Sequence, residues 1–249
     1  MKRGVCVLLL CCSAAPCLAD TPAFDRPGIA FSTGTLPAGS YAWEQGVPDV
    51  ARDRADGVRS TQLSADTLVR VGLSARMELQ LGTSLYNHVH SSGSGVDETH
   101  QGYGDTSLAL KAALPTGSER VSWAALAGIG LASGQEPFTA GATQVSLGST
   151  AAWALDESCS LSFYAAVERA AGRNEYSASP SLGLALTDTL DAYVEAGITH
   201  ADGTNDAVAG GGLTWMVLPK VQLDLYADGG LTRASTDLLA GAGVSIFFN

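Results

Sequence analysis

The chain has 249 residues, of which 46% are apolar and 16% charged, whereas an ordinary soluble domain has ~25% charged residues. Its formal net charge is −11, from 14 Lys+Arg against 25 Asp+Glu, which argues against a basic nucleic-acid-binding surface. The apolar content and the low number of prolines exclude a disordered chain, and no segment after residue 19 reads as a transmembrane helix. With 29 glycines, the composition indicates one large, weakly charged β domain.

The first 19 residues have the pattern of a secretory signal peptide. Lys2 and Arg3 precede an apolar run over 5–10, and small residues lead to Ala19, after which we expect cleavage. Cleavage leaves 12 Lys+Arg against 25 Asp+Glu, a net charge of −13, and Cys159 as the single cysteine. An exported chain with one cysteine forms no internal disulfide and no cysteine metal site, so its stability must come from a large closed structure.

Apolar and polar residues alternate with a period of two along much of the remaining chain. In the clearest stretch, 221–228, Val221, Leu223 and Leu225 share one face, and Asp224 lies on the other. The same alternation recurs over 77–82, 107–114, 161–168 and 191–198, which predicts β-strands rather than helices.

The spacing of turn residues divides the chain into strands of similar length. Short turns near 74–76, 115–120, 156–159, 187–189 and 218–220 alternate with longer polar loops near 51–60, 87–104, 133–141, 170–176, 200–206 and 229–236. Twelve strands are therefore predicted, at 41–50, 61–73, 77–86, 105–114, 121–132, 142–154, 160–169, 177–186, 190–199, 207–217, 221–228 and 237–248.

These strands are close to the ~9–11 residues that a tilted strand needs to cross a bilayer. An even number of strands, with short turns at one end and long loops at the other, predicts a transmembrane antiparallel up-and-down β-barrel over residues 40–249. Its place is the outer membrane of a Gram-negative bacterium, with both termini in the periplasm. Residues 20–39 precede the barrel as an extended periplasmic lead or an inserted plug.

Aromatic residues gather at one end of this predicted barrel. An aromatic girdle at one membrane interface would have this arrangement. The alternative fold, a soluble β-sandwich, would not favour tryptophans at one end. The predicted girdle consists of Trp43, Trp123, Trp153, Trp215 and Phe248.

Charged residues within the strands fall on the polar faces and should point into the lumen. They are Glu44, Arg70, Glu78, Lys111, Glu168, Glu195 and Asp224. The first four lie on adjacent strands and can form one ion-pair ladder, either as a selectivity constriction or proton-linked gate, or as a stabilising network that plugs the interior. The later strands are acidic inside, which either favours cations or is ordinary lumen polarity.

Two stretches carry a resemblance to a known family. One runs from Asp25-Arg26-Pro27-Gly28 through 35–46, and the other is a strand, a tight turn and a Glu-bearing strand over 68–82. Here the chain resembles the outer-membrane barrel family named for the meta pathway of phenol degradation. The resemblance implies an outer-membrane barrel that passes small, often apolar or aromatic, compounds, and it brings no defined catalytic residues. The chain departs from the usual barrel ending, because Asn249 follows Phe248, the aromatic residue that the barrel-assembly machinery reads.

The remaining polar clusters give weaker signals. His88, His90, His100 and His200 fall in predicted loops, where a Gly- and Ser-rich context fixes no metal geometry, and no catalytic triad is identifiable. The run Arg52-Asp53-Arg54-Ala55-Asp56, with Arg59, reads as a solvated surface loop, with binding of charged lipopolysaccharide as the alternative.

The sequence thus favours an outer-membrane channel or transporter for small, hydrophobic or aromatic, molecules. It is not expected to be an enzyme, to need a cofactor or metal, or to bind nucleic acid. Its expected partners are outer-membrane lipid, the barrel-assembly machinery and a small-molecule solute, which would pass along the lumen or by a lateral opening. A filled structural or adhesive barrel and a rim-located lipid-modifying enzyme are the alternatives.

Overall fold

The computed structural model describes residues 23–249, and the predicted signal peptide lies outside them. Within this range the chain forms thirteen β-strands. They are β1 (Tyr41–Ala55), β2 (Val58–Ser74), β3 (Met77–Gly93), β4 (Val96–Gly102), β5 (Thr106–Leu114), β6 (Val121–Leu131), β7 (Gln144–Ala154), β8 (Cys159–Ala170), β9 (Arg173–Ala185), β10 (Leu190–Ala201), β11 (Thr204–Leu218), β12 (Val221–Gly230) and β13 (Leu238–Phe248).

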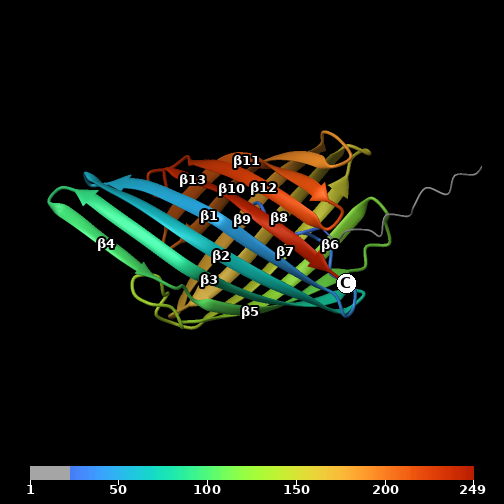
Figure 1. Cartoon of the computed structure of the whole chain (residues 1–249), viewed down its shortest axis with the longest axis horizontal. Helices are drawn as coiled ribbons and strands as arrows, with labels where there is room; N and C mark the ends of the chain where they lie inside the picture. The colour runs from blue at the N-terminus through green and yellow to red at the C-terminus, as the bar shows by residue number, and fades with distance from the viewer. Residues whose placement is uncertain (1–22) are drawn as a thin grey trace, which may run out of the picture.

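The strands close into one antiparallel barrel. Consecutive strands pair from β5 through to β13, and β1 pairs with both β2 and β13, which closes the sheet (Figure 1). Both β4 and β5 pair with β3, one after the other, so they are two segments of a single barrel strand interrupted at 103–105. The predicted fold, a twelve-stranded up-and-down β-barrel, is confirmed.

The distribution of burial is the reverse of that in a soluble protein. On β12, Leu225 faces outward and is 54% exposed, whereas its neighbour Asp224 faces inward and is 5% exposed. Such an apolar outer surface suits lipid, and polar residues on the inner face suit a lumen. The alternation that predicted the strands therefore also separates the two faces of the wall. Among residues 23–249, no helix is long and apolar enough to cross a membrane.

The connections differ from the prediction. Four of the predicted long loops are strand extensions that end in two-residue turns, namely Asp56-Gly57, Ser94-Gly95, Ala171-Gly172 and Asp202-Gly203. Both residues of each turn have positive φ, the conformation of a tight hairpin turn whose twist matches the flanking strands. The prediction was wrong because polar residues near these turns were read as loop rather than as the solvated ends of long strands. Two longer connections do occur at this end of the barrel, over 132–143 and 231–237.

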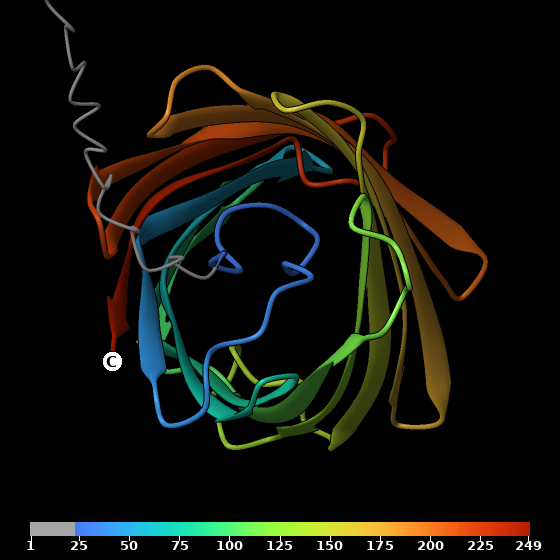
Figure 2. The same ribbon diagram turned by 90° about the vertical axis from the view of Figure 1, so that its right-hand side faces the viewer.

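The segment before β1 lies inside the barrel. Figure 2, a view along the barrel, shows this segment in blue, looped within the ring of strands. We call residues 23–39 the plug. Its apolar side chains Phe24 and Leu36 pack with Ala42 and Phe247 of the wall, and these four residues form a small buried apolar cluster. The barrel wall and the plug are therefore packed against each other, which positions the candidate site.

Candidate functional site: a plug held by buried ion pairs

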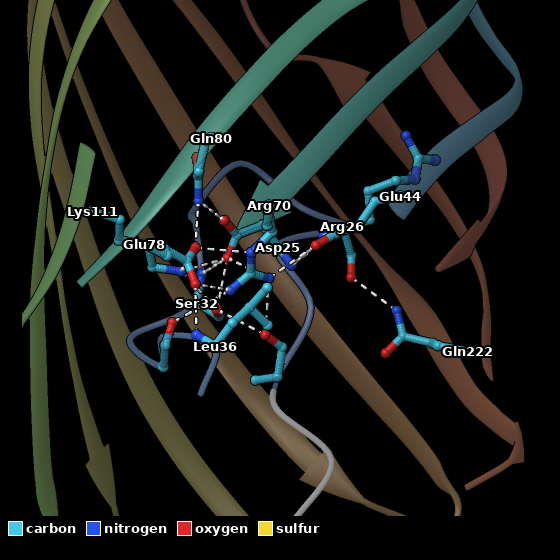
Figure 3. A network of polar contacts seen from close by, with 12 residues as sticks. Asp25, Arg26, Ser32, Leu36, Glu44, Arg70, Glu78, Gln80, Lys111 and Gln222 are labelled. Carbon is cyan, nitrogen blue, oxygen red and sulfur yellow. Dashed lines mark hydrogen bonds and ion pairs between the residues drawn. The ribbon is translucent and has the colours of Figure 1, made fainter. Parts of the chain in front are cut away.

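Arg70 is the centre of a buried polar network on the inner wall. Its Nε donates to Glu78 Oε1 at 2.8 Å, and its Nη1 donates to Glu44 Oε1 at 2.9 Å (Figure 3). Arg70, Glu44 and Glu78 are all 0% exposed. Because buried charges are tolerated only when paired and hydrogen-bonded, these contacts make Arg70 the counter-ion for both carboxylates.

The strand register explains why these residues meet. Arg70 on β2 lies opposite Gln80 on β3, so Glu78 is two residues away on the same inner face. Glu78 lies directly opposite Lys111 on β5, and their charged atoms are 3.7 Å apart. The four residues expected to form an ion-pair ladder are thus brought together by four neighbouring strands.

The plug supplies a further carboxylate to this network. Asp25 accepts a hydrogen bond from Lys111 Nζ at 2.7 Å and another from Gln80 Nε2 at 2.7 Å, and it lies 3.4 Å from Arg70 Nη1. Its backbone N–H donates to Glu44. Burial alone would raise the pKa of Asp25, but Arg70 and Lys111 together hold that pKa below its usual range. Asp25 therefore stays ionised at neutral pH and ties the plug to the wall.

Arg26 attaches the plug to a neighbouring part of the wall, on β1 and β12. Its guanidinium contacts Asp49 Oδ1 at 3.1 Å and Asp224 Oδ1 at 3.2 Å, and its carbonyl accepts from Gln222 Nε2 at 2.9 Å. A β-bulge between Gly46 and Asp49 shifts the register of β1 so that Asp49 faces the lumen. The plug thus uses adjacent residues of opposite charge to bind two separate clusters.

A third set of contacts extends along the plug. The backbone N–H of Ile29 donates to Glu195 Oε2 at 3.0 Å, and the ring of Phe31 meets Tyr164 edge-on, with centroids 5.8 Å apart. Of the acidic residues predicted to line the later strands, Glu195 and Asp224 therefore contact the plug. Glu168 does not take part; it accepts from Gln144 and lies opposite Glu175.

The other predicted residues lie away from this network. The four tryptophans and Phe248 point outward at the end of the barrel that holds the C-terminus, and each is 36–51% exposed. The histidines lie on β3, β4 and β10 rather than in loops, so their assignment to loops was wrong. Within residues 23–249, no group of His, Cys, Asp or Glu is arranged to hold a metal ion.

Two hollows border β7 to β10, and one of them lies next to the plug. A cavity of about 260 Å³ is lined on one side by plug residues, including Phe24 and Phe31, and on the other by Ala152, Ser162 and Ser181. A hollow of about 450 Å³ lies at the end of the same strands, and Tyr193 borders both. The plug is therefore held by contacts with the wall, while small side chains such as Ala152, Ser162 and Ser181 leave a cavity beside it.

The comparisons with known proteins agree with this architecture. A family model described as "Putative MetA-pathway of phenol degradation" matches residues 24–248. The chain belongs to this family. No curated protein matches the sequence significantly.

Solved structures similar to this family member include a channel, a porin and the β domain of an autotransporter. An outer membrane channel from Pseudomonas putida F1 superposes with a TM-score of 0.73 at 14% identity, covering 90% of this chain and 99% of that chain. The KdgM porin has a TM-score of 0.53 at 9% identity, covering 84% and 99%. The β domain of the Bordetella autotransporter BrkA has a TM-score of 0.52 at 14% identity, covering 86% and 100%. At these identities the similarity establishes the fold.

Sequence reasoning missed several residues that hold the plug, among them Asp25, Arg26, Asp49 and Gln222. A signal existed for the first two, because this charged pair lies within the stretch that carries the family resemblance. Asp49 and Gln222 gave no such signal, since a bulge and a contact across 196 residues place them.

Gly72 on β2 is required where the plug leaves the lumen. A Cβ there would lie 2.0 Å from the carbonyl oxygen of Pro37 and 2.7 Å from that of Leu36. We expect Gly72→Ala to push the end of the plug off the wall and to destabilise the protein by about 1–3 kcal/mol. Urea unfolding measures this cost, and Gly229→Ala is the control because no atom lies within 4 Å of its Cβ position. Equal unfolding midpoints for the two variants would contradict close packing at Gly72.

Proposed function

We propose that this protein is a plugged channel of the Gram-negative outer membrane that passes small hydrophobic or aromatic molecules. The observation that carries the proposal is the cavity between the plug and β7 to β10, which shares Tyr193 with the second hollow and which we take as the passage for the solute. The apolar outer surface supports the membrane location, and the fold shared with an outer membrane channel supports the class.

The lining of this passage supports the choice of solute. Aromatic rings from Phe24, Phe31 and Tyr193 border the cavity, and the facing wall adds small side chains together with the carboxylate of Glu195. Aromatic rings bind other rings in stacked or edge-on arrangements, so these three rings suit flat aromatic solutes. The family description, with its reference to phenol degradation, agrees with this substrate class.

A filled structural barrel is the second candidate. The observation that favours it is the number of contacts holding the plug, which involve Glu44, Arg70, Glu78, Asp224 and Glu195 of the wall. A barrel of this size can be packed by its own side chains and conduct nothing. Flux measurements separate the two candidates.

Blocking the passage tests the channel directly. Ala152 faces the cavity, whereas its neighbour Ala151 faces outward on the same strand, beside Phe163. We expect Ala152→Trp to remove most of the solute flux, because an indole ring would occupy the space beside the plug, and Ala151→Trp to leave the flux unchanged. Swelling of liposomes that contain the folded protein measures the flux.

Two amino acids serve as solutes that cross lipid poorly. Phenylalanine and leucine are both zwitterions, and only phenylalanine has a ring. Faster entry of phenylalanine, despite its larger size, supports the aromatic preference. A folded wild-type barrel that admits neither solute favours the filled barrel, and equal flux through both tryptophan variants contradicts the proposed route.

A further inference from the structure

Three arginines lie together on the outside of the barrel near one rim. Arg52 and Arg54 lie on β1, and Arg59 lies on β2 directly opposite Arg54. Because Asp49 faces the lumen and side chains alternate along a strand, Arg52 and Arg54 point outward. These residues form part of two strands, so their assignment to a surface loop was wrong. We call them the outer arginine cluster.

The cluster begins where the apolar outer surface ends. Starting at the end of the barrel that holds the C-terminus, the outer face of β1 carries Tyr41, Trp43, Val47 and Val50, and then Arg52. At ~3.4 Å per residue and a tilt near ~40°, the stretch 41–50 spans a height of ~25 Å, which is the thickness of the apolar band of such barrels. The guanidinium groups therefore lie at the level of lipid headgroups. The longest connections of the chain lie at this end, which makes it the extracellular side.

Residues 23–249 supply no counter-ion to the cluster. Among residues 23–249, none of the three guanidinium groups forms an ion pair within 4.0 Å. At the same end of the barrel Arg173 pairs with Asp202 at 3.0 Å, and Arg169 donates to Asn174 at 2.9 Å. Like charges directly opposite each other on neighbouring strands are destabilising, so the pairing of Arg54 with Arg59 calls for an external anion.

The surroundings of the cluster have room for such an anion. A hollow of about 520 Å³ is lined by the three arginines together with Thr61, Leu238, Asp53 and Asp237. Asp53 belongs to the lumen-facing set of β1, and neither carboxylate lies within ion-pair distance of the cluster. Below the hollow, Leu63, Val50 and Ala240 form the start of the apolar surface. The site therefore offers positive charge near the rim of the barrel and an apolar surface next to it, toward the middle of the membrane.

We propose that the outer arginine cluster binds the phosphate groups of lipid A, the phosphorylated glycolipid of the outer leaflet. Arginine presents several donors in a planar fork that matches phosphate oxygens, and three guanidinium groups can share one phosphate between two strands. The acyl chains then lie along the apolar surface below. The inference rests on the proposed outer-membrane location, but it does not depend on whether the lumen conducts.

Binding of lipid A to the purified, folded protein in detergent tests this inference. The test variant replaces Arg52, Arg54 and Arg59 with glutamine, and the control replaces Arg169 and Arg173, which already have protein partners. We expect the triple variant to bind lipid A about tenfold or more weakly than wild type, because it loses charge-assisted hydrogen bonds, and the control to bind as wild type does. Native mass spectrometry counts the bound lipid.

Wild-type protein alone gives a second measurement that needs no variant. Lipid A stripped of its phosphates should bind about as weakly to wild type as intact lipid A binds to the triple variant. The proposal is overturned if wild type binds lipid A equally well with and without its phosphates. It is also overturned if the triple variant binds lipid A as tightly as wild type does. Displacement of lipid A by an equal concentration of inorganic phosphate would show a general anion site and would also overturn it. Conductance is measured separately, so a failure here leaves the channel proposal to its own test.

Discussion

Replacing Arg70 with alanine is expected to destabilise the barrel and to release the plug from β1, β2 and β3. The substitution leaves Glu44, Glu78 and Asp25 without their shared cation and removes the donor to the carbonyl oxygen of Ala23. Removing one partner from a buried ion pair costs about 3–5 kcal/mol, because the remaining charge stays buried. Urea unfolding followed by tryptophan fluorescence measures the loss.

Two further substitutions separate the charge of Arg70 from its geometry. Arg70→Lys keeps the charge but offers no planar fork of donors. Its free energy of unfolding should therefore lie between those of Arg70→Ala and wild type. Arg76→Ala, in the exposed turn between β2 and β3, should change stability by no more than about 0.5 kcal/mol. An unfolding midpoint for Arg70→Ala that equals that of Arg76→Ala would show that the network contributes nothing to stability.

Deleting residues 24–36 is expected to raise the single-channel conductance several-fold. The plug fills the lumen beside β1 to β5 and β10 to β13, and its removal would open this space to water (Figure 2). The barrel should still fold, because its closure depends on the pairing of β1 with β13, which the deletion leaves intact. Folding is checked by heat-modifiable gel mobility before the protein is inserted into a planar bilayer.

The ion selectivity of the plug-free barrel is a second measurement in this experiment. The deletion removes Asp25 and Arg26 together, so the net charge of the lumen does not change. Glu44, Glu78, Asp49, Asp224 and Glu195 remain against Arg70 and Lys111. A preference for cations should therefore persist while the conductance rises. A plug-free barrel that conducts no better than wild type would mean that another part of the chain closes the lumen.

The sequence predicted one half of the candidate site and missed the other. The residues Glu44, Arg70, Glu78 and Lys111 could be found because alternation assigns each to the inner face and their strands are neighbours in sequence. Their partners Asp25 and Arg26 lie in a segment where apolar and polar residues do not alternate regularly, so the sequence does not predict where these side chains point. The salt bridge between Arg26 and Asp224 joins residues 198 positions apart.

The sequence by itself determined the barrel, the number of strands that close it and the face on which residues of the regular strand stretches lie. It could do so because a β-strand imposes a period of two on its own residues, and a membrane requires one apolar face. Only the tertiary structure decided that the plug lies inside the lumen and which carboxylates hold it. It also decided that Arg54 lies opposite Arg59. Strand register, β-bulges and the path of the plug arise from contacts between distant parts of the chain. Local alternation of apolar and polar residues does not predict them.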